Sequence, residues 1–439
     1  MTWATVKPGH DILRDMDHAA RADRGESLGA RLTAATSDVA GPVAVVDLDR
    51  FDANARSLVT RAGRAPVRVA SKSVRVAALV ERALADPTHG VAGVGGFAGV
   101  MAFSLAEALW LVERGTRDVL VAYPTVDRRA LARLAASAAA RAEITLMVDD
   151  VAHVALLAAA VAAAGEDTEG AAGPAEGSPV QVCLDVDASL RLGRGRWAVH
   201  LGTRRSPLRT PGQAAALAAR VAATPGLHVR GAMFYEAQVA GLQDSSAAVR
   251  AVKRASVADL AVRRGEVVAA VADAVGHPLE LVNSGGTGSL ETSAADPVVT
   301  EVSAGSGLFV PTSFDGYRAF EPLPAAFFGL DVVRVPAPGW ATLFAGGYAA
   351  SGKAGPSRLP RPAQDEGWSL TGAEGAGEVQ TPLRRGRGAR RELAVGDRVW
   401  FRHAKAGEMM ERFASVHLVR GRETVEVVPT YRGDGHCFG

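Results

Sequence analysis

In Arg68-Val-Ala-Ser-Lys-Ser73, a lysine follows shortly after the β-branched run Val67–Ala70. A helical segment begins at about Val76. A β-branched run followed by a helix is one unit of a parallel sheet. Lys72 then lies at the carboxyl end of a strand, where α/β barrels place their active sites. Burial and cationic neighbours can lower the pKa of a lysine there, which frees its amine for imine formation. The alternative is a surface lysine that merely ends the strand.

The same rhythm of strand and helix repeats along the chain. Eight strands are predicted, at Val67–Ala70, Gly90–Val94, Asp118–Ala122, Ile144–Val148, Val180–Val186, His228–Phe234, Leu279–Asn283 and Val298–Val302. Helical periodicity is visible at Ser104–Arg114, Arg128–Arg141 and Gln213–Ala223. Eight such units within about 260 residues match an α/β fold of the (β/α)8 TIM barrel type. An open doubly wound sheet is the competing architecture, but no Gly-x-Gly-x-x-Gly follows the first strand.

The two ends of the chain depart from this rhythm. We expect residues 1–40 to form an N-terminal extension that packs on a β domain, and residues 41–321 to form the barrel, beginning with the run Val43–Asp47. Strands without helices predict a separate C-terminal β domain over residues 322–439. Its strands are expected at Gly329–Arg334, Trp340–Ala345, Gly396–Arg402, Ser415–Val419 and Thr424–Val428.

Gly352–Arg391, inside the predicted β domain, is rich in Gly, Pro, Arg and Ser. This composition is typical of a solvated, flexible insertion in a β hairpin. A loop that recruits an acidic partner is the alternative interpretation.

Composition excludes several classes of protein. The chain has 439 residues, 48% of them hydrophobic and 22% charged, and a formal net charge of +2. Such a small net charge does not favour nucleic acid or an anionic membrane as a partner. Two cysteines, Cys183 and Cys437, exclude a disulfide framework and a four-cysteine zinc site. With neither a secretory signal nor an apolar span in the sequence, we expect a soluble, cytoplasmic enzyme.

Two glycine-rich turns follow the last two predicted barrel strands. They read Asn283-Ser-Gly-Gly-Thr-Gly-Ser289 and Ala304-Gly-Ser-Gly307. Glycine turns let backbone N–H groups approach a phosphate, and Thr287, Ser289 and Ser306 add hydroxyl donors. Barrels commonly place a phosphate site in the loops after these two strands. Two unrelated tight turns are the alternative.

Asp185-Val-Asp-Ala-Ser-Leu-Arg-Leu-Gly193 places an arginine beyond the fifth predicted strand. An arginine on the active face can donate to the nitrogen of a pyridine ring, which keeps that nitrogen unprotonated and weakens the ring as an electron sink. Alternatively, Arg191 pairs with Asp185 or Asp187.

The order of these segments, together with Pro42-Val-Ala-Val-Val-Asp-Leu-Asp49, resembles the fold-type III pyridoxal-phosphate enzymes, whose N-terminal domain is alanine racemase-like. Within them the chain is similar to the branch of D-threonine aldolase and D-serine dehydratase. It is most similar to the group labelled amino acid deaminase/aldolase, which it matches in Phe401-Arg-His-Ala-Lys-Ala-Gly-Glu408 and Thr430-Tyr-Arg-Gly-Asp-Gly435. The resemblance runs from about residue 40 to the C-terminus and is looser after Pro322.

The resemblance implies that Lys72 holds pyridoxal 5'-phosphate as a Schiff base and that Arg191 contacts the pyridine nitrogen. The phosphate would be held by Gly286, Thr287, Gly288, Ser289, Gly305, Ser306 and Gly307. Tyr235 lies where the aldolase branch has a tyrosine-containing segment near the cofactor, and it would orient Lys72 or the cofactor. The alternative is a packed tyrosine with a hydrated hydroxyl.

One segment departs from the branch. Its members bind a divalent metal through a His-x-Cys pair, and this chain has His403-Ala-Lys405 instead. A protonated lysine has no lone pair for a metal. Either His403 still binds metal with Glu408 or another carboxylate, or Lys405 supplies a fixed positive charge for the substrate's hydroxyl or carboxylate. In the second case His403 would transfer protons near neutral pH. A buried structural histidine is the third interpretation.

The resemblance implies a lyase that acts on a β-hydroxy D-amino acid, by retro-aldol cleavage or by dehydration and deamination. An amino acid racemase is one alternative, with Tyr348 the obvious candidate for its second base. A non-catalytic protein that binds pyridoxal phosphate is another, although the residues after Pro322 argue against it. The resemblance also implies a homodimer with a small-molecule substrate.

Overall fold

A computed structural model of the chain describes residues 27–85, 95–166, 178–193, 197, 199–363 and 366–439. Contacts within the chain divide it into two compact units. The barrel unit comprises Arg61–Ser71, Gly90–Ala304 and Phe438–Gly439; the β-domain unit comprises Met1–Thr60, Lys72–His89 and Gly305–Cys437.

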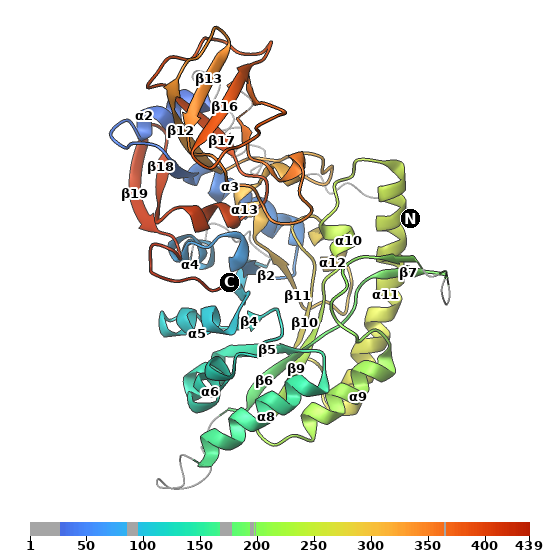
Figure 1. The fold of residues 1–439 in the computed structure, drawn as a ribbon. Helices are drawn as coiled ribbons and strands as arrows, with labels where there is room; N and C mark the ends of the chain where they lie inside the picture. Colours follow the sequence, from blue (N-terminus) through green and yellow to red (C-terminus); the bar gives the residue numbers. More distant parts are fainter. Residues whose placement is uncertain (1–26, 86–94, 167–177, 194–196, 198, 364–365) are drawn as a thin grey trace. The chain divides into compact units, whose positions relative to one another are not determined.

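Eight parallel strands close the barrel of the barrel unit, which confirms the predicted TIM-barrel fold (Figure 1). In their order around the barrel they are β10 (Leu281–Ser284), β11 (Glu301–Ala304), β2 (Val67–Ala70), β3 (Phe97–Ala102), β4 (Val119–Val121), β5 (Ile144–Val148), β6 (Val180–Asp185) and β9 (Leu227–Phe234). Seven of them overlap the predicted strands. The eighth prediction, Gly90–Val94, lies outside the described residues, and β3 holds its place in the order.

Helices surround these strands as the helical periodicity predicts. The longer ones are α5 (Leu105–Glu113), α6 (Arg128–Ala136), α7 (Ala138–Glu143), α8 (Val151–Glu166), α9 (Pro211–Ala222) and α11 (Ala247–Val275). The single helix predicted over Arg128–Arg141 is two helices, because Ser137 is extended and its hydroxyl caps α7 by accepting from the Ala140 N–H. None of the described helices is long and apolar enough to cross a membrane.

A buried ion-pair network crosses the barrel interior. Arg68 on β2 donates to both carboxylate oxygens of Glu301 on β11, at 2.6 and 2.7 Å, and to Asp118, at 2.7 Å. Arg230 on β9 donates to Asp118 and to the Thr145 hydroxyl. Burial alone would lower the pKa of Arg68, but its two carboxylate partners raise the pKa instead. Paired in this way, the guanidinium stays charged in a place where an unpaired charge would be costly.

Further along the same strands, the centre of the barrel is apolar. Its buried layer consists of Leu120, Ala122, Met147, Cys183, Met233 and Leu281. Burial raises the pKa of the Cys183 thiol, so this cysteine stays protonated and behaves as a small apolar side chain.

A nine-stranded sheet forms the core of the β-domain unit. Its main path is β15 (Trp368–Leu370), β16 (Gln380–Arg385), β13 (Trp340–Phe344), β12 (Ala326–Arg334), β1 (Val43–Asp47), β18 (Ser415–Arg420) and β19 (Glu423–Pro429). Off this path, β17 (Arg398–Arg402) pairs with β12 and with β14 (Arg361–Pro362). The five strands predicted after Pro322 are all present, with ends shifted by a few residues.

The run Val43–Asp47 belongs to this sheet, although we predicted it to open the barrel region. As β1 it pairs antiparallel with β12 and parallel with β18, and all five of its residues are buried. A strand that is apolar on both faces needs a neighbouring strand at each edge and packing against each face. Both the barrel and the sheet of the β-domain unit could provide these contacts. Periodicity therefore predicts the strand correctly but not its partners.

The segment Gly352–Arg391 also differs from its prediction as a flexible insertion. It contributes β14, β15 and β16 to the sheet. Thr381 and Leu383 on β16 are fully buried while their neighbours are more exposed, which is the alternation of a strand. The alternation is too short to be noticed among the surrounding glycines and arginines, whose abundance predicted a loop.

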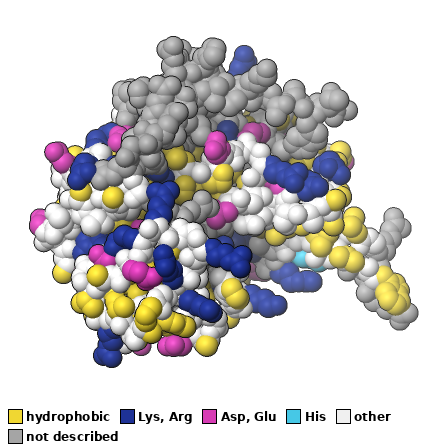
Figure 2. All heavy atoms as spheres, turned by 90° about the horizontal axis from the view of Figure 1, so that it is seen from above, with side chains coloured by type: hydrophobic (Ala, Val, Ile, Leu, Met, Phe, Trp, Pro, Cys, Tyr) yellow, Lys and Arg dark blue, Asp and Glu magenta, His cyan; other side chains and the backbone are white. Residues whose placement is uncertain are grey.

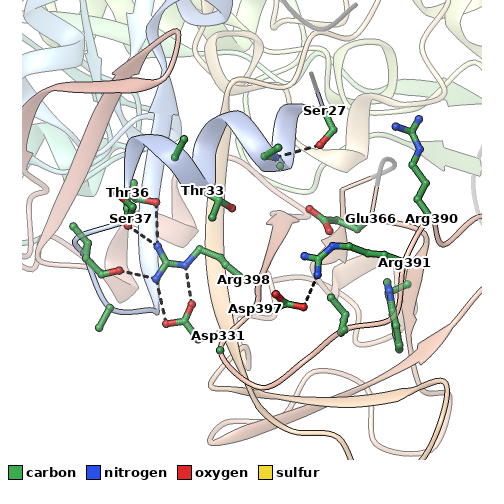
Figure 3. A pocket seen from close by; sticks show the side chains of 18 of the residues that line it. Ser27, Thr33, Thr36, Ser37, Asp331, Glu366, Arg390, Arg391, Asp397 and Arg398 are labelled. Carbon is green, nitrogen blue, oxygen red and sulfur yellow. Dashed lines mark hydrogen bonds and ion pairs between the residues drawn. The ribbon is translucent and has the colours of Figure 1, made fainter. Parts of the chain in front are cut away.

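Helix α2 (Leu28–Ala35) packs on the same sheet. Leu32 and Ala35 join Trp400, Phe327 and Val45 in one apolar cluster, and Ser27 caps the helix. A cavity of about 820 Å³ lies beside α2, between the helix and Arg398 of β17 (Figure 3).

Charged groups in this cavity are largely paired with one another. Arg398 uses all five of its N–H donors on Asp331, on the Thr36 carbonyl and hydroxyl, and on the Val39 carbonyl, as Figure 3 shows in part. Arg391 pairs with Asp397. Arg398 thus attaches the segment after α2 to the sheet.

On the molecular face in Figure 2, cationic and anionic side chains are interspersed, in keeping with the small net charge.

Candidate active site

Three neighbouring strands lead into the segments that we predicted to carry the chemistry. Strands β10, β11 and β2 are adjacent in the barrel. The turn Gly285–Ser289 follows β10, Gly305–Gly307 follows β11, and the short 3-10 helix Ser71–Ser73 follows β2. Because parallel strands end at the same rim, the lysine and the two glycine turns each follow a strand at that rim, and their meeting in one site stays a prediction.

A buried carboxylate organises the turn after β10. Glu236, 2% exposed, accepts hydrogen bonds from the Ser284 hydroxyl at 2.9 Å, the Gly285 N–H at 3.2 Å and the Ser289 hydroxyl at 2.8 Å. The Ser293 hydroxyl adds a fourth. We did not predict Glu236 as a functional residue. Its one signal in the sequence is its position next to Tyr235 at the end of a strand.

Two residues of this turn have roles in shaping the loop. The Ser289 hydroxyl accepts from the Gly286 N–H at 3.1 Å while it donates to Glu236. The direct donation to phosphate that we predicted for Ser289 would require this bond to break. A Cβ on Gly286 would lie 2.9 Å from the Ala240 Cβ, so only glycine fits there without a shift. Arg61 donates to the Thr287 carbonyl at 2.6 Å and pairs with Glu291.

The backbone of Lys72 is held within the β-domain unit. Its carbonyl accepts from Arg75 Nε at 3.1 Å, and a Cβ on Gly407 would lie only 1.9 Å from the carbonyl oxygen. Gly407 has a φ of +84°, which a side chain would also disfavour. The Ser73 and Ser306 hydroxyls are hydrogen bonded at 3.0 Å. The structure therefore brings the lysine segment, the turn after β11 and the segment after Lys405 together.

His403 is buried among apolar groups. It is 2% exposed and meets the Phe309 ring edge-on, with centroids 6.2 Å apart. Burial, with a smaller contribution from Arg402, lowers the pKa of His403 to about 3, and the Ala326 backbone opposes this only weakly. We predicted proton transfer near neutral pH from the ordinary pKa of histidine. With a pKa this low the ring stays neutral, which favours the interpretation as a buried structural histidine.

Lys405 makes a polar cluster with Ser351 and Glu408. Its ammonium lies 2.8 Å from the Ser351 hydroxyl and 3.0 Å from the Glu408 carboxylate, and that carboxylate also accepts from the Ser351 N–H at 2.6 Å. Burial raises the pKa of Glu408, but the hydrogen bonds from Ser351 and Lys405 outweigh it and lower the pKa. The three charged or titratable residues His403, Lys405 and Glu408 line one cavity.

This donor set does not fit a divalent metal. The side-chain nitrogen of Lys405 already contacts the Glu408 carboxylate. A protonated lysine has no lone pair with which to bind a metal. In the described ranges, no three His, Cys, Asp or Glu side chains are grouped so that they could hold a metal ion. The predicted pairing of His403 with Glu408 at a metal therefore lacks the ligands that it needs.

Tyr348 lines the cavity of His403 and Lys405 as well. Its ring packs edge-on against Phe328 and Phe413, with centroids 5.0 and 5.4 Å away, and burial raises the pKa of its hydroxyl. A raised pKa leaves less of this tyrosine as the phenolate that accepts a proton, which does not favour its predicted role as a racemase base.

Arg191 is paired with Asp187, as one of our alternatives predicted. It lies on β7 (Leu190–Leu192), which forms a hairpin with β8 (Val199–Leu201). Its guanidinium is 45% exposed and donates to Asp187 at 2.6 Å. Burial raises the pKa of Asp187, but hydrogen bonds from Ser189 and Arg191 outweigh it and lower the pKa. Contact with a pyridine nitrogen stays a prediction for this residue.

Tyr235 and Tyr123 cover the apolar centre of the barrel. The Tyr235 ring also lies 3.5 Å from the position that a Cβ on Gly286 would take. Burial raises the pKa of Tyr235 to about 12, so its phenol remains protonated and can donate a hydrogen bond. Tyr235 is thus placed beside the glycine turn, as its predicted role requires.

Comparison with known proteins gives this arrangement a context. No family model matches the chain. It is 27% identical over 325 residues to a D-threonine aldolase from an Arthrobacter species, covering 72% of this chain and 74% of that protein. It is 26% identical over 283 residues to 3-hydroxy-D-aspartate aldolase from Paracoccus denitrificans, covering 63% and 62%.

Among solved structures, D-threonine aldolase from Filomicrobium marinum matches with a TM-score of 0.72 and 22% identity, covering 90% of this chain and 96% of that one. D-threo-3-hydroxyaspartate dehydratase from a Delftia species matches with a TM-score of 0.65 and 22% identity, covering 89% and 97%. The chain is therefore similar in sequence to a D-threonine aldolase and a 3-hydroxy-D-aspartate aldolase, and these relatives fit the resemblance to fold-type III pyridoxal-phosphate enzymes.

Proposed function

We propose that this chain is a pyridoxal-phosphate-dependent lyase that cleaves or dehydrates a β-hydroxy D-amino acid. One observation carries the proposal: β10, β11 and β2 are neighbours, and they lead into two glycine turns and Lys72. The named relatives of the chain are aldolases, and they support a lyase over a racemase.

The residues present fit this cofactor. Gly285–Ser289 offers backbone N–H groups to a phosphate, on a loop that Glu236 and Arg61 hold in shape. Ser306 and Gly305–Gly307 would add donors after β11, and Lys72 would hold the cofactor's aldehyde carbon. When bound, pyridoxal phosphate supplies an electron sink for negative charge at the substrate Cα. Tyr235, protonated and next to Gly286, would donate a hydrogen bond that orients the bound group.

Lys405 is proposed to act where the relatives of the branch use a metal. Its side-chain nitrogen is held at a fixed place by the Ser351 hydroxyl and the Glu408 carboxylate. In this position it would hold the substrate's β-hydroxyl oxygen and favour the negative charge that develops there when the Cα–Cβ or the C–O bond breaks. His403, buried and neutral, would position the segment that carries Lys405.

The cofactor proposal is tested by reconstitution with pyridoxal phosphate. The wild-type protein should gain visible absorbance and retain it on gel filtration, and Lys72→Ala should lose both. Lys353→Ala, which changes an exposed lysine, is the matched control and should behave as the wild type. A protein that remains colourless with excess cofactor would contradict the proposal. Turnover of D-threonine and D-threo-3-hydroxyaspartate, followed as released aldehyde, glycine or ammonia, then distinguishes cleavage from dehydration.

The role of Lys405 is tested by metal analysis and chelation. We expect the active protein to contain less than one divalent ion per chain and to keep its activity after treatment with a chelator. Lys405→Cys, which creates a His-x-Cys pair, should gain affinity for Zn²⁺ or Mn²⁺, whereas Lys405→Met should lose activity without gaining metal. Loss of wild-type activity on chelation would contradict the role.

We further propose a cytoplasmic homodimer, since the family resemblance implies a dimer and no described helix could span a membrane. Light scattering coupled to size-exclusion chromatography tests the oligomeric state, and a monomer at micromolar concentration would contradict it.

A further inference from the structure

A second polar cluster lies over the centre of the barrel, and the proposed function uses only Tyr235 of it. Tyr123 follows β4, Asp149 follows β5, Asp185 ends β6, and Tyr235 follows β9. Arg205, from the loop after β8, completes the cluster. All five residues belong to the barrel unit, and four of them stand at carboxyl ends of its strands, the side on which barrels bind substrates.

Arg205 lies against both tyrosine rings. Its guanidinium carbon is 5.1 Å from the centroid of Tyr235 and 5.6 Å from that of Tyr123. Such cation–π contacts hold a guanidinium plane without using its N–H donors. In the part of the chain that the structure describes, the Arg205 side chain makes no hydrogen bond or ion pair, and the residue is exposed. Its five donors therefore remain available to an anion.

The loop that carries Arg205 is fixed to the barrel. The Ser206 hydroxyl donates to the Asp185 carbonyl at 2.6 Å and accepts from the Leu208 N–H at 3.0 Å. The Asp187 N–H donates to the Leu208 carbonyl at 2.7 Å. The residues that directly follow Arg205 are thus tied to the end of β6, which makes Arg205 a preorganised cation.

The nearby carboxyls make no ion pair with Arg205 among the described residues. Asp185 is 7% exposed, and no hydrogen bond to its carboxylate occurs among the described residues. Burial, with a smaller contribution from Asp149, raises the pKa of Asp185 to about 7, while Arg205 opposes the rise. The Asp149 carboxylate lies 3.2 Å from the ring nitrogen Nδ1 of His153. A protonated Asp185 can also donate a hydrogen bond beside the guanidinium.

We propose that Arg205 binds a second carboxylate of the substrate, so that the preferred substrate is a β-hydroxy amino acid with an acidic side chain. The proposal rests on the proposed function and names its substrate class. A guanidinium fork is the group that best matches a carboxylate.

Kinetics with two substrates test the assignment. Arg205→Gln should lower kcat/KM for D-threo-3-hydroxyaspartate by about 100-fold, mainly through KM, because one charge-assisted pair is lost. The same variant should change kcat/KM for D-threonine by less than about threefold. Arg205→Lys should recover part of the loss, and Arg204→Gln, the exposed neighbour, should behave as the wild type. Equal losses on both substrates would overturn the proposal, because Arg205 would then bind a group that the two substrates share.

A binding measurement separates this proposal from the proposed function. Succinate and butyrate differ by one carboxylate in place of a methyl group, and neither can react. By calorimetry, the wild-type holoenzyme should bind succinate more tightly than butyrate, and Arg205→Gln should bind both equally. If the protein turns over neither amino acid but keeps this preference, the lyase proposal fails and the carboxylate site stands. If the wild type binds the two alike, the carboxylate site fails whatever the activity.

Discussion

At the scale of single residues, two buried carboxyls of the barrel unit illustrate opposite environments. Glu236 receives hydrogen bonds from four donors at the turn after β10. Asp185 is about as buried but receives none at its carboxylate among the described residues. The first therefore shapes a loop through its hydrogen bonds, whereas burial raises the pKa of the second.

Glu236→Gln should weaken the phosphate turn. The amide nitrogen of glutamine cannot accept a hydrogen bond, and the loss of charge weakens the bonds that remain, each by about 1 kcal/mol. We expect affinity for pyridoxal phosphate to fall by at least about tenfold, measured by fluorescence titration. Glu266→Gln, on the exposed face of α11, is the control and should bind as the wild type. An unchanged affinity in Glu236→Gln would show that the turn keeps its shape without this carboxylate.

Asp185→Asn should make stability less dependent on pH. Burial raises the pKa of Asp185 from 3.8 to about 7 in the folded state, so the folded protein holds this proton more tightly than the unfolded chain does. The contribution of Asp185 to stability is therefore full below about pH 4 and is lost as the pH rises to about 7. At pH 8 the Asn variant should be more stable than the wild type, by at most about 4 kcal/mol, with little difference at pH 4. Urea denaturation at the two pH values measures this, and a larger gain at pH 4 would contradict it.

At the scale of secondary-structure elements, the attachment of α2 and the segment after it depends on one arginine. Arg398 on β17 bonds Asp331 on β12 and three acceptors between Thr36 and Val39. The apolar contacts of Leu32 and Ala35 add to this attachment. The sequence predicts only that residues 1–40 pack on the β domain, and the partners of Arg398 reveal how the part after α2 is held.

Arg398→Met should destabilise the β-domain unit. Methionine keeps much of the apolar stem but leaves Asp331 and two backbone carbonyls without their cationic partner, at a cost of about 3 kcal/mol. We expect a lower midpoint of denaturant unfolding, followed by the fluorescence of Trp400, which packs beside α2. Arg387→Met, which changes an exposed arginine, should leave the midpoint unchanged. Equal midpoints for the two variants would show that the apolar contacts alone hold the segment.

At the scale of the whole molecule, both units are discontinuous in the sequence. The chain passes between them after Thr60, Ser71, His89, Ala304 and Cys437. The sheet of the β-domain unit depends on this arrangement, because β1, from the N-terminal part of the chain, lies between β12 and β18. The predicted boundary at residue 322 therefore divides a sheet.

A fragment of residues 322–439 should not fold alone. Without β1, the edges of β12 and β18 lose their shared partner and expose buried apolar faces, which favours aggregation. We expect an insoluble fragment, or a soluble one that lacks cooperative thermal unfolding by circular dichroism. Supplying residues 27–60 should improve its solubility. A cooperatively folded fragment without β1 would contradict the topology-based expectation.

Local periodicity is sufficient to predict the barrel. The runs that form β2, β5, β6 and β9 are rich in apolar and β-branched residues and are separated by helix-length segments, a local pattern that depends on no distant residue. Local order likewise predicts Lys72 and the glycine turns, because connectivity alone places them after neighbouring strands. The strand missed at Phe97–Ala102 contains two small residues and a glycine, which weaken the same signal.

Long-range pairing decided the rest. Which sheet accepts Val43–Asp47, whether Arg191 is paired, and what Glu236 bonds all depend on residues far apart in the sequence, and periodicity carries no information about them. Burial is likewise a tertiary property, so the pKa of His403 and that of Asp185 could not be read from residue type. The sequence by itself determined the barrel and the lysine at its rim; only the tertiary structure decided which side chains around them are charged, paired or available.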